Sequence, residues 1–152
     1  MNDKLIAKLN ACLAHEWTGV AQYSQMGFMV TGLWREPYAE MFFDSAKESF
    51  GHARRVGDKI AAMGGVPTLE RNKVQVGDDI HGMLQHALEF EQTAVKHYME
   101  ALAMADCVDR PLVVLLEEIL LEEQDGVDQL SRIIREHGTA ASAEGHKKSK
   151  TG

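Results

Sequence analysis

The amino-acid sequence predicts an all-α protein, a four-helix bundle with one long crossover connection. In four long stretches, apolar residues recur at spacings of three and four, as they do on the buried face of a helix. The three prolines all stand between these stretches, at positions 37, 67 and 111. The first and last connections are short, which favours antiparallel neighbours. The middle connection has roughly 15 residues and can run back along the bundle.

The first half of the chain predicts two long helices. The first covers residues 3–31 and ends at Gly32. The second covers residues 37–63, where Pro37 suits the first helical turn and Gly64 suits a C-terminal cap. Each helix carries an apolar stripe along one face, so we expect the two to pack against each other.

The second half predicts two more helices. The third begins after Asp78 and Asp79, which are good N-cap residues, and runs to residue 108. The fourth covers residues 112–137 and ends at Gly138. Their order and the long middle connection complete the predicted bundle.

Length and composition limit the class of protein. The chain has 152 residues, which suits one domain with a sizeable core. We expect this domain over residues 1–138, followed by a disordered polar tail over residues 139–152 that has no large apolar side chain. Since no apolar run approaches the roughly 20 residues that a bilayer requires, the sequence predicts no membrane span.

Charge and cysteine content limit the partners. The formal net charge is −7, which argues against nucleic-acid binding and favours cation binding. The two cysteines are too few for a disulfide scaffold or a zinc cluster. The first residues show no signal peptide, so we expect a cytoplasmic protein with reduced thiols.

Each predicted helix carries one polar residue within its apolar stripe, near the middle of its length. These residues are Glu16, His52, Glu91 and Glu123. Any one of them alone is explained by a rim glutamate or a hydrogen-bonded core histidine. Burying three neighbouring carboxylates together is costly, however, and a divalent cation offsets that cost. Carboxylates with one imidazole suit iron or manganese, and also zinc.

The helix order, the long crossover and these four residues resemble the ferritin-like superfamily, most closely its bacterioferritin branch. The resemblance covers residues 4–138. It includes the pair Gln22-Tyr23 after the first glutamate and the segment Gly65-Val66-Pro67-Thr68-Leu69 after the second helix. It implies a ferritin-like bundle that binds iron and oxidises Fe(II) with dioxygen or peroxide.

The chain departs from the di-iron motif of this family at two positions. The motif has one Glu on each of two helices and a Glu-x-x-His on each of the other two. Ser49 stands where the second helix would carry Glu, and Gly126 stands where the fourth would carry His. The resemblance implies one half-site that keeps Glu16, His52 and Glu123. The other keeps only Glu91 and a share of Glu123.

We therefore expect a mononuclear or weak dinuclear iron centre. Glu48 lies one helical turn before His52 and is a candidate substitute ligand. Glu122 and Asp125 are weaker candidates, and solvation is the usual role of all three residues.

Two further expectations follow from the resemblance. Tyr23 lies two turns beyond Glu16 on the same stripe, where a related tyrosine can hydrogen-bond near the metal and supply an electron. The alternative is a core tyrosine with a satisfied hydroxyl. Phe50 stands where bacterioferritins carry their haem-ligating Met, which argues against haem binding.

These observations favour iron storage and Fe(II) oxidation with an incomplete ferroxidase centre. The alternative is a non-catalytic structural subunit that co-assembles with an active paralogue, and a mononuclear oxidoreductase ranks third. Ferritin-like bundles commonly pair, so we expect a homo-oligomer, either a dimer or a cage, or a hetero-oligomer with the paralogue. The apolar residues expected on its surface are Leu33, Trp34, Phe43 and Phe90.

Overall fold

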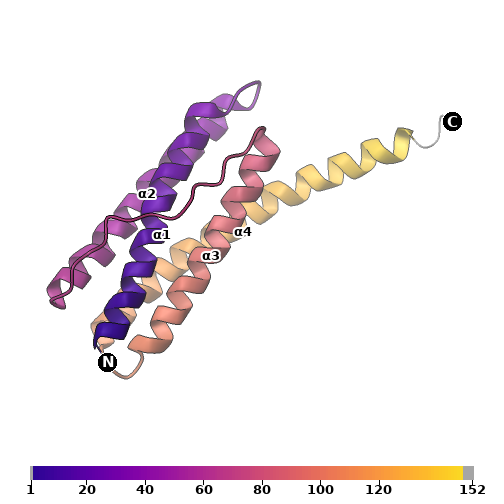
Figure 1. Ribbon diagram of the computed structural model, residues 1–152. Coiled ribbons are helices and arrows are strands. Elements are labelled where there is room, and N and C mark those ends of the chain that lie inside the picture. The colour runs from indigo at the N-terminus through magenta and orange to yellow at the C-terminus, as the bar shows by residue number, and fades with distance from the viewer. Residues whose placement is uncertain (1, 149–152) are drawn as a thin grey trace.

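The computed structural model describes the backbone of residues 2–148 and the side chains of residues 2–135. The described chain forms four helices and no strand, which confirms the predicted all-α four-helix bundle (Figure 1). The helices are α1 (Asn2–Met29), α2 (Arg35–Ala62), α3 (Ile80–Ala105) and α4 (Arg110–Lys148). None of them is long and apolar enough to cross a membrane over the described residues.

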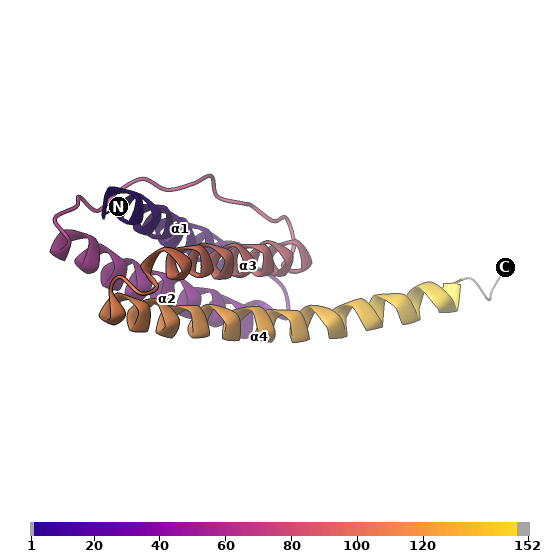
Figure 2. The same ribbon diagram turned by 90° about the horizontal axis from the view of Figure 1, so that it is seen from below.

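The bundle consists of two helical hairpins. Helix α1 packs along α2, α3 packs along α4, and contacts between α1 and α3 join the two pairs. The crossover between α2 and α3 runs the length of the bundle beside α1 and α3, on the side away from α4 (Figure 2). The long connection therefore returns the chain to the other end of the bundle, as predicted.

Side chains of α1 hold the crossover in place. The side chains of Asn10 and Trp17 donate hydrogen bonds to crossover carbonyls, and those of Thr18 and Gln22 accept bonds from crossover N–H groups. These bonds give partners to backbone groups that lie outside regular secondary structure. The Trp17 side chain is thereby held against the crossover by its 2.9 Å hydrogen bond to the Thr68 carbonyl.

Three of the predicted helix ends carry the expected signals. Gly32 and Gly64 follow α1 and α2 with φ angles of +84° and +83°, a left-handed conformation that glycine adopts without steric cost. Asp79 caps α3, because its side chain accepts a 2.7 Å hydrogen bond from the Gly82 N–H.

The end predicted for the fourth helix is wrong. Helix α4 continues through Gly138 to Lys148, and Figure 1 shows this last segment projecting beyond the other helices. A glycine inside a helix costs only about 1 kcal/mol, and the alanines that follow it are the best helix formers. The backbone of residues 139–148, expected to be disordered, is thus helical, and residues 149–152 lie outside the described residues. The domain boundary at residue 138 stays a prediction.

The core has two apolar clusters with a polar layer between them. One cluster lies toward the start of α1 and includes Leu9, Leu13 and Ile119. The other lies toward the end of α1 and includes Phe42 and Phe90. Phe90, expected on the surface, is buried and stacks on His15 with ring centroids 4.0 Å apart. The four polar residues of the helical stripes fall between the two clusters.

Candidate metal centre

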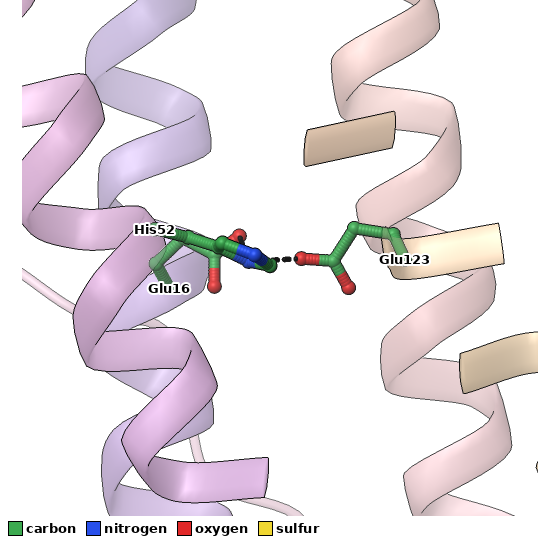
Figure 3. Close-up of side chains that lie close together, drawn as sticks. All are labelled: Glu16, His52 and Glu123. Carbon is green, nitrogen blue, oxygen red and sulfur yellow. Dashed lines mark ion pairs between the residues drawn. The ribbon is translucent and has the colours of Figure 1, made fainter. Parts of the chain in front are cut away.

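Three helices bring one ligand-type side chain each to the polar layer. Glu16 comes from α1, His52 from α2 and Glu123 from α4 (Figure 3). Each offers one ligand atom, and these atoms all lie within 4.8 Å of one another. All three residues are buried, with exposed fractions of 0%, 3% and 2%. The structure thus brings together the three residues of the half-site that was expected to keep most of its ligands.

The atoms of this trio are close but poorly paired. His52 Nδ1 lies 2.7 Å from Glu123 Oε1 and 3.5 Å from Glu16 Oε1. Nevertheless, Glu16 Oε2 lacks a hydrogen-bond partner among the described residues, and His52 Nδ1 makes no well-directed hydrogen bond despite its ion pair with Glu123. A buried polar atom without a partner costs about 1–3 kcal/mol. A cation between the three side chains would satisfy both atoms, so these residues fit a metal ion.

The electrostatics of the trio also favour a cation. Burial disfavours the charged imidazolium, but the carboxylates of Glu123 and Glu16 outweigh this and raise the pKa of His52 to about 11. Burial, with the nearby charge of Glu16, raises the pKa of Glu123 to about 7. Metal ligands bind in their deprotonated forms, so a divalent ion would replace the protons held here.

Glu91 lies beside the trio without belonging to it. Its Oε1 accepts a hydrogen bond from the Tyr23 hydroxyl, and its Oε2 is buried without a partner among the described residues. Burial, followed by the neighbouring carboxyl group of Glu123, holds the pKa of Glu91 well above its usual range. Tyr23 is fully buried and bonded to a carboxyl of the site. This hydrogen bond fits both expectations for Tyr23, a residue beside the metal site and a core tyrosine with a satisfied hydroxyl, and electron supply stays a prediction.

The second half-site is a pocket. Gly126 and Glu91 both line it, and a Cβ added at position 126 would lie only 3.2 Å from the Glu91 carboxyl carbon, so Glu91 packs directly against this glycine. The pocket of about 130 Å³ is also lined by Glu48, Glu122 and Asp125. Glu48 thus faces the pocket and lies outside the trio. Burial raises its pKa.

Two further residues touch the trio from outside. The Tyr98 hydroxyl donates a 2.8 Å hydrogen bond to Glu16 Oε1, and Glu122 Oε2 lies 2.6 Å from His52 Nε2. Neither contact was predicted from the sequence. A tyrosine within an apolar stripe gives no polar signal, although the spacing of seven residues from Glu91 places Tyr98 on the same face of α3. Glu122 was considered only as a substitute ligand.

The comparisons with known proteins agree with this architecture. Residues 6–137 match the family described as a ferritin-like domain. The fold is also similar to a structure described as "ferritin like, diiron-carboxylate proteins" from Bacillus anthracis str. Ames. The TM-score is 0.85 and the sequence identity is 28%, over 88% of this chain and 96% of that one. Together with the four helices and the long crossover, the match over most of the chain shows that this protein belongs to the ferritin-like family.

Proposed function

We propose that the protein binds Fe(II) at Glu16, His52 and Glu123 and oxidises it, as a bacterioferritin-like iron-storage protein with an incomplete ferroxidase centre. The observation that carries this proposal is the convergence of three buried ligand atoms from three helices, within 4.8 Å of one another. The similar structure from Bacillus anthracis is described as a diiron-carboxylate protein, which supports iron as the metal.

The ligand set suits this chemistry. Hard carboxylate oxygens favour the ferric over the ferrous state, so bound Fe(II) gives up an electron to dioxygen or peroxide more readily. Two irons side by side can share a two-electron reduction, whereas the trio holds one. We therefore expect slow oxidation and a stoichiometry near one iron per chain.

Whether the centre is mononuclear or weakly dinuclear depends on whether the pocket beside Glu91 binds a second ion. Glu91 and Glu48 are the candidate ligands for a second ion there, since both line the pocket. The absence of side-chain ligands at Ser49 and Gly126 favours weak binding at this second position. The half-exposed Phe50, at the position of the bacterioferritin haem ligand, supports a centre without haem.

The first experiment measures iron per chain after anaerobic Fe(II) loading and removal of free metal. We expect near one iron per chain in the wild type and none in Glu16→Ala. Glu117→Ala is the matched control, because Glu117 is an exposed carboxylate on α4. Near two per chain would assign a second ion to the pocket, and near zero in the wild type would contradict the proposed site.

The second candidate function is a structural subunit that co-assembles with an active paralogue. Ser49 and Gly126, which remove two of the six ligands of the family motif, favour it. Large apolar side chains are also exposed near the turn between α1 and α2, and these support a dimer or a cage. They are Phe28, Leu33, Trp34 and Phe43. Purification of the tagged protein from its native cells would test this candidate, which requires a second ferritin-like chain in stoichiometric amount.

A further inference from the structure

We infer that a pocket at one end of the bundle binds Cu(I) through the thioether sulfurs of Met26, Met29 and Met83. The pocket has a volume of about 150 Å³ and is lined by residues from α1, the crossover and α3. None of the three candidate iron ligands lines it, so this inference goes beyond the proposed function and does not depend on it.

The three methionines come together from two helices. Met26 and Met29 stand three residues apart near the end of α1, and this spacing places both side chains on one face of the helix. Met83 belongs to the start of α3, which lies at the same end of the bundle as the end of α1 (Figure 1). The helical spacing thus supplies two thioethers and the fold supplies the third.

Burial explains two of these methionines better than the third. Met26 and Met83 are only 2% and 4% exposed and belong to the apolar cluster toward the end of α1. Met29 also lines the pocket, but it is 54% exposed, so it gains much less from burial. Its sulfur would complete a three-thioether site with the two buried methionines.

The chemistry of the pocket suits a soft, singly charged cation. Thioether sulfur is a soft ligand that selects Cu(I), whereas carboxylates suit harder ions. The other polar side chains that line the pocket are those of Gln25, Gln75 and Asp78. Of the described residues that line it, Asp78 alone is charged, and its negative charge favours a cation over an anion.

The backbone around the pocket is held in place without a metal. The Gln75 N–H donates a 2.9 Å hydrogen bond to Gln22 Oε1, which ties the crossover to α1. At Gly77 the crossover approaches α3 so closely that an added Cβ would lie 2.7 Å from the Met83 nitrogen. Cu(I) binding therefore requires only rotation of methionine side chains, which are flexible and have polarizable sulfurs.

The test is an anaerobic titration of the full-length chain with Cu(I), in competition with a chromophoric Cu(I) chelator. Cys107 is an exposed thiol and would compete as a soft ligand, so Cys107→Ser is the parent protein. We expect the parent to hold near one Cu(I) per chain. Met26→Leu, Met29→Leu and Met83→Leu should each lose it, because leucine conserves the volume of methionine and removes the sulfur.

Met99→Leu is the matched control, since Met99 is an exposed methionine of α3 that does not line the pocket. This variant should keep the Cu(I) of the parent. Glu16→Ala should keep it as well, because the candidate iron site lies elsewhere. Thermal unfolding without metal checks that each variant is folded.

A residue-specific measurement locates the ion. Cu(I) is diamagnetic, so the parent can be labelled with ¹³C at its methionine methyl groups and followed by NMR during the titration. The methyl signals of Met26, Met29 and Met83 should shift together and reach their end points near one equivalent. The methyl signal of Met99 should stay where it is.

Three results would overturn the inference. The first is a parent that holds no Cu(I) against the chelator. The second is Cu(I) binding that survives any of the three pocket substitutions. The third is a parent whose Cu(I) is lost in Glu16→Ala, which would place the ion at the carboxylate site. The iron content of Glu16→Ala tests the proposed function separately, so the failure of one proposal is distinguished from the failure of the other.

Discussion

Gly126 lines the pocket beside Glu91 and stands where the di-iron motif of the family has a histidine, so the proposed second half-site has no imidazole. The neighbouring Glu91 carboxyl lies at the end of a flexible side chain, so it can shift to admit a larger residue at this position.

Substituting Gly126→His should therefore restore a second metal position. We expect the iron content after anaerobic loading to rise from near one toward two per chain, because the added imidazole joins Glu91 and Glu123. Gly51→His is the control, since Gly51 has no atom within 4 Å of its added Cβ. An unchanged iron content in Gly126→His would show that the pocket cannot hold a second ion.

His97 lies outside the candidate centre, beside Lys8 of α1. Burial and the nearby charge of Lys8, whose Nζ lies 3.1 Å from Nδ1, lower the pKa of His97 to about 4. The folded pKa lies below the unfolded value of 6.5. Neutral His97 thus contributes stability fully above pH 6.5, and this contribution is lost as the pH falls toward 4.

We therefore expect the Tm of the metal-free protein to fall as the pH is lowered from about 7 to 4.5. His97→Gln should flatten this dependence, because it keeps an acceptor for Lys8 and cannot take up a proton. His81→Gln serves as the control, since His81 is exposed. If the Tm of the wild type and the Tm of His97→Gln fell equally with pH, His97 would not be the group responsible.

The site residues that were predicted from the sequence differ in their polarity pattern from the contacts that were missed. Glu16, His52 and Glu123 were found because a charged or polar side chain interrupts an apolar stripe. Tyr98 was missed because its ring satisfies that stripe while its hydroxyl acts on Glu16. The partner of Glu122 depends on how α4 is rotated against α2, which the sequence spacing does not determine.

At the scale of elements, close helix packing depends on small residues. A Cβ added to Gly19 of α1 would lie 2.4 Å from Ser49 Oγ and 2.5 Å from a ring carbon of Phe90. Gly19 therefore permits close approach of α2 and α3 to α1. Gly51, by contrast, lies on the exposed face of α2 and contacts nothing that a methyl group would disturb.

Replacing these two glycines with alanine should change the free energy of unfolding in opposite directions. Gly51→Ala should raise the free energy of unfolding by about 0.5–1 kcal/mol, because alanine has the higher helix propensity. Gly19→Ala should lower it by about 1–3 kcal/mol through overpacking. Urea denaturation measures both. If both substitutions changed the free energy of unfolding equally, close packing of the helices would not require a glycine at position 19.

The elements themselves were largely predictable, with one instructive exception. Periodicity, glycine caps and the Asp79 cap located the helices to within a few residues. The end of α4 was wrong because a single glycine was given more weight than the alanine-rich segment after it. Local propensity competes with such stop signals, and a glycine alone does not end a helix.

For the whole molecule, the candidate centre joins the two hairpins. Glu16 and His52 belong to the α1–α2 hairpin, and Glu123 belongs to the α3–α4 hairpin. Figure 3 shows the Glu123 side chain pointing toward the other two from the opposite side. A metal held by all three would be bound by the folded state alone, so it should stabilise the entire bundle.

This predicts a metal-dependent Tm. Zn(II) at 100 times its Kd should add about 2.7 kcal/mol to the free energy of unfolding. For a chain of this size, that corresponds to a rise in Tm of roughly 5–10 °C. In differential scanning calorimetry, Zn(II) should not raise the Tm of Glu16→Ala. It should raise the Tm of Glu117→Ala as much as that of the wild type. A wild-type Tm indifferent to Zn(II) would exclude a three-ligand site.

The distribution of the ligands along the chain also bears on how the protein is made. Helix α4 follows the other three helices along the chain, so a growing chain displays Glu16 and His52 well before Glu123. Until then it offers only two of the three donors and no closed polar layer. At the proposed site, binding of a metal by all three residues would therefore have to wait until α4 has been made and the two hairpins have paired.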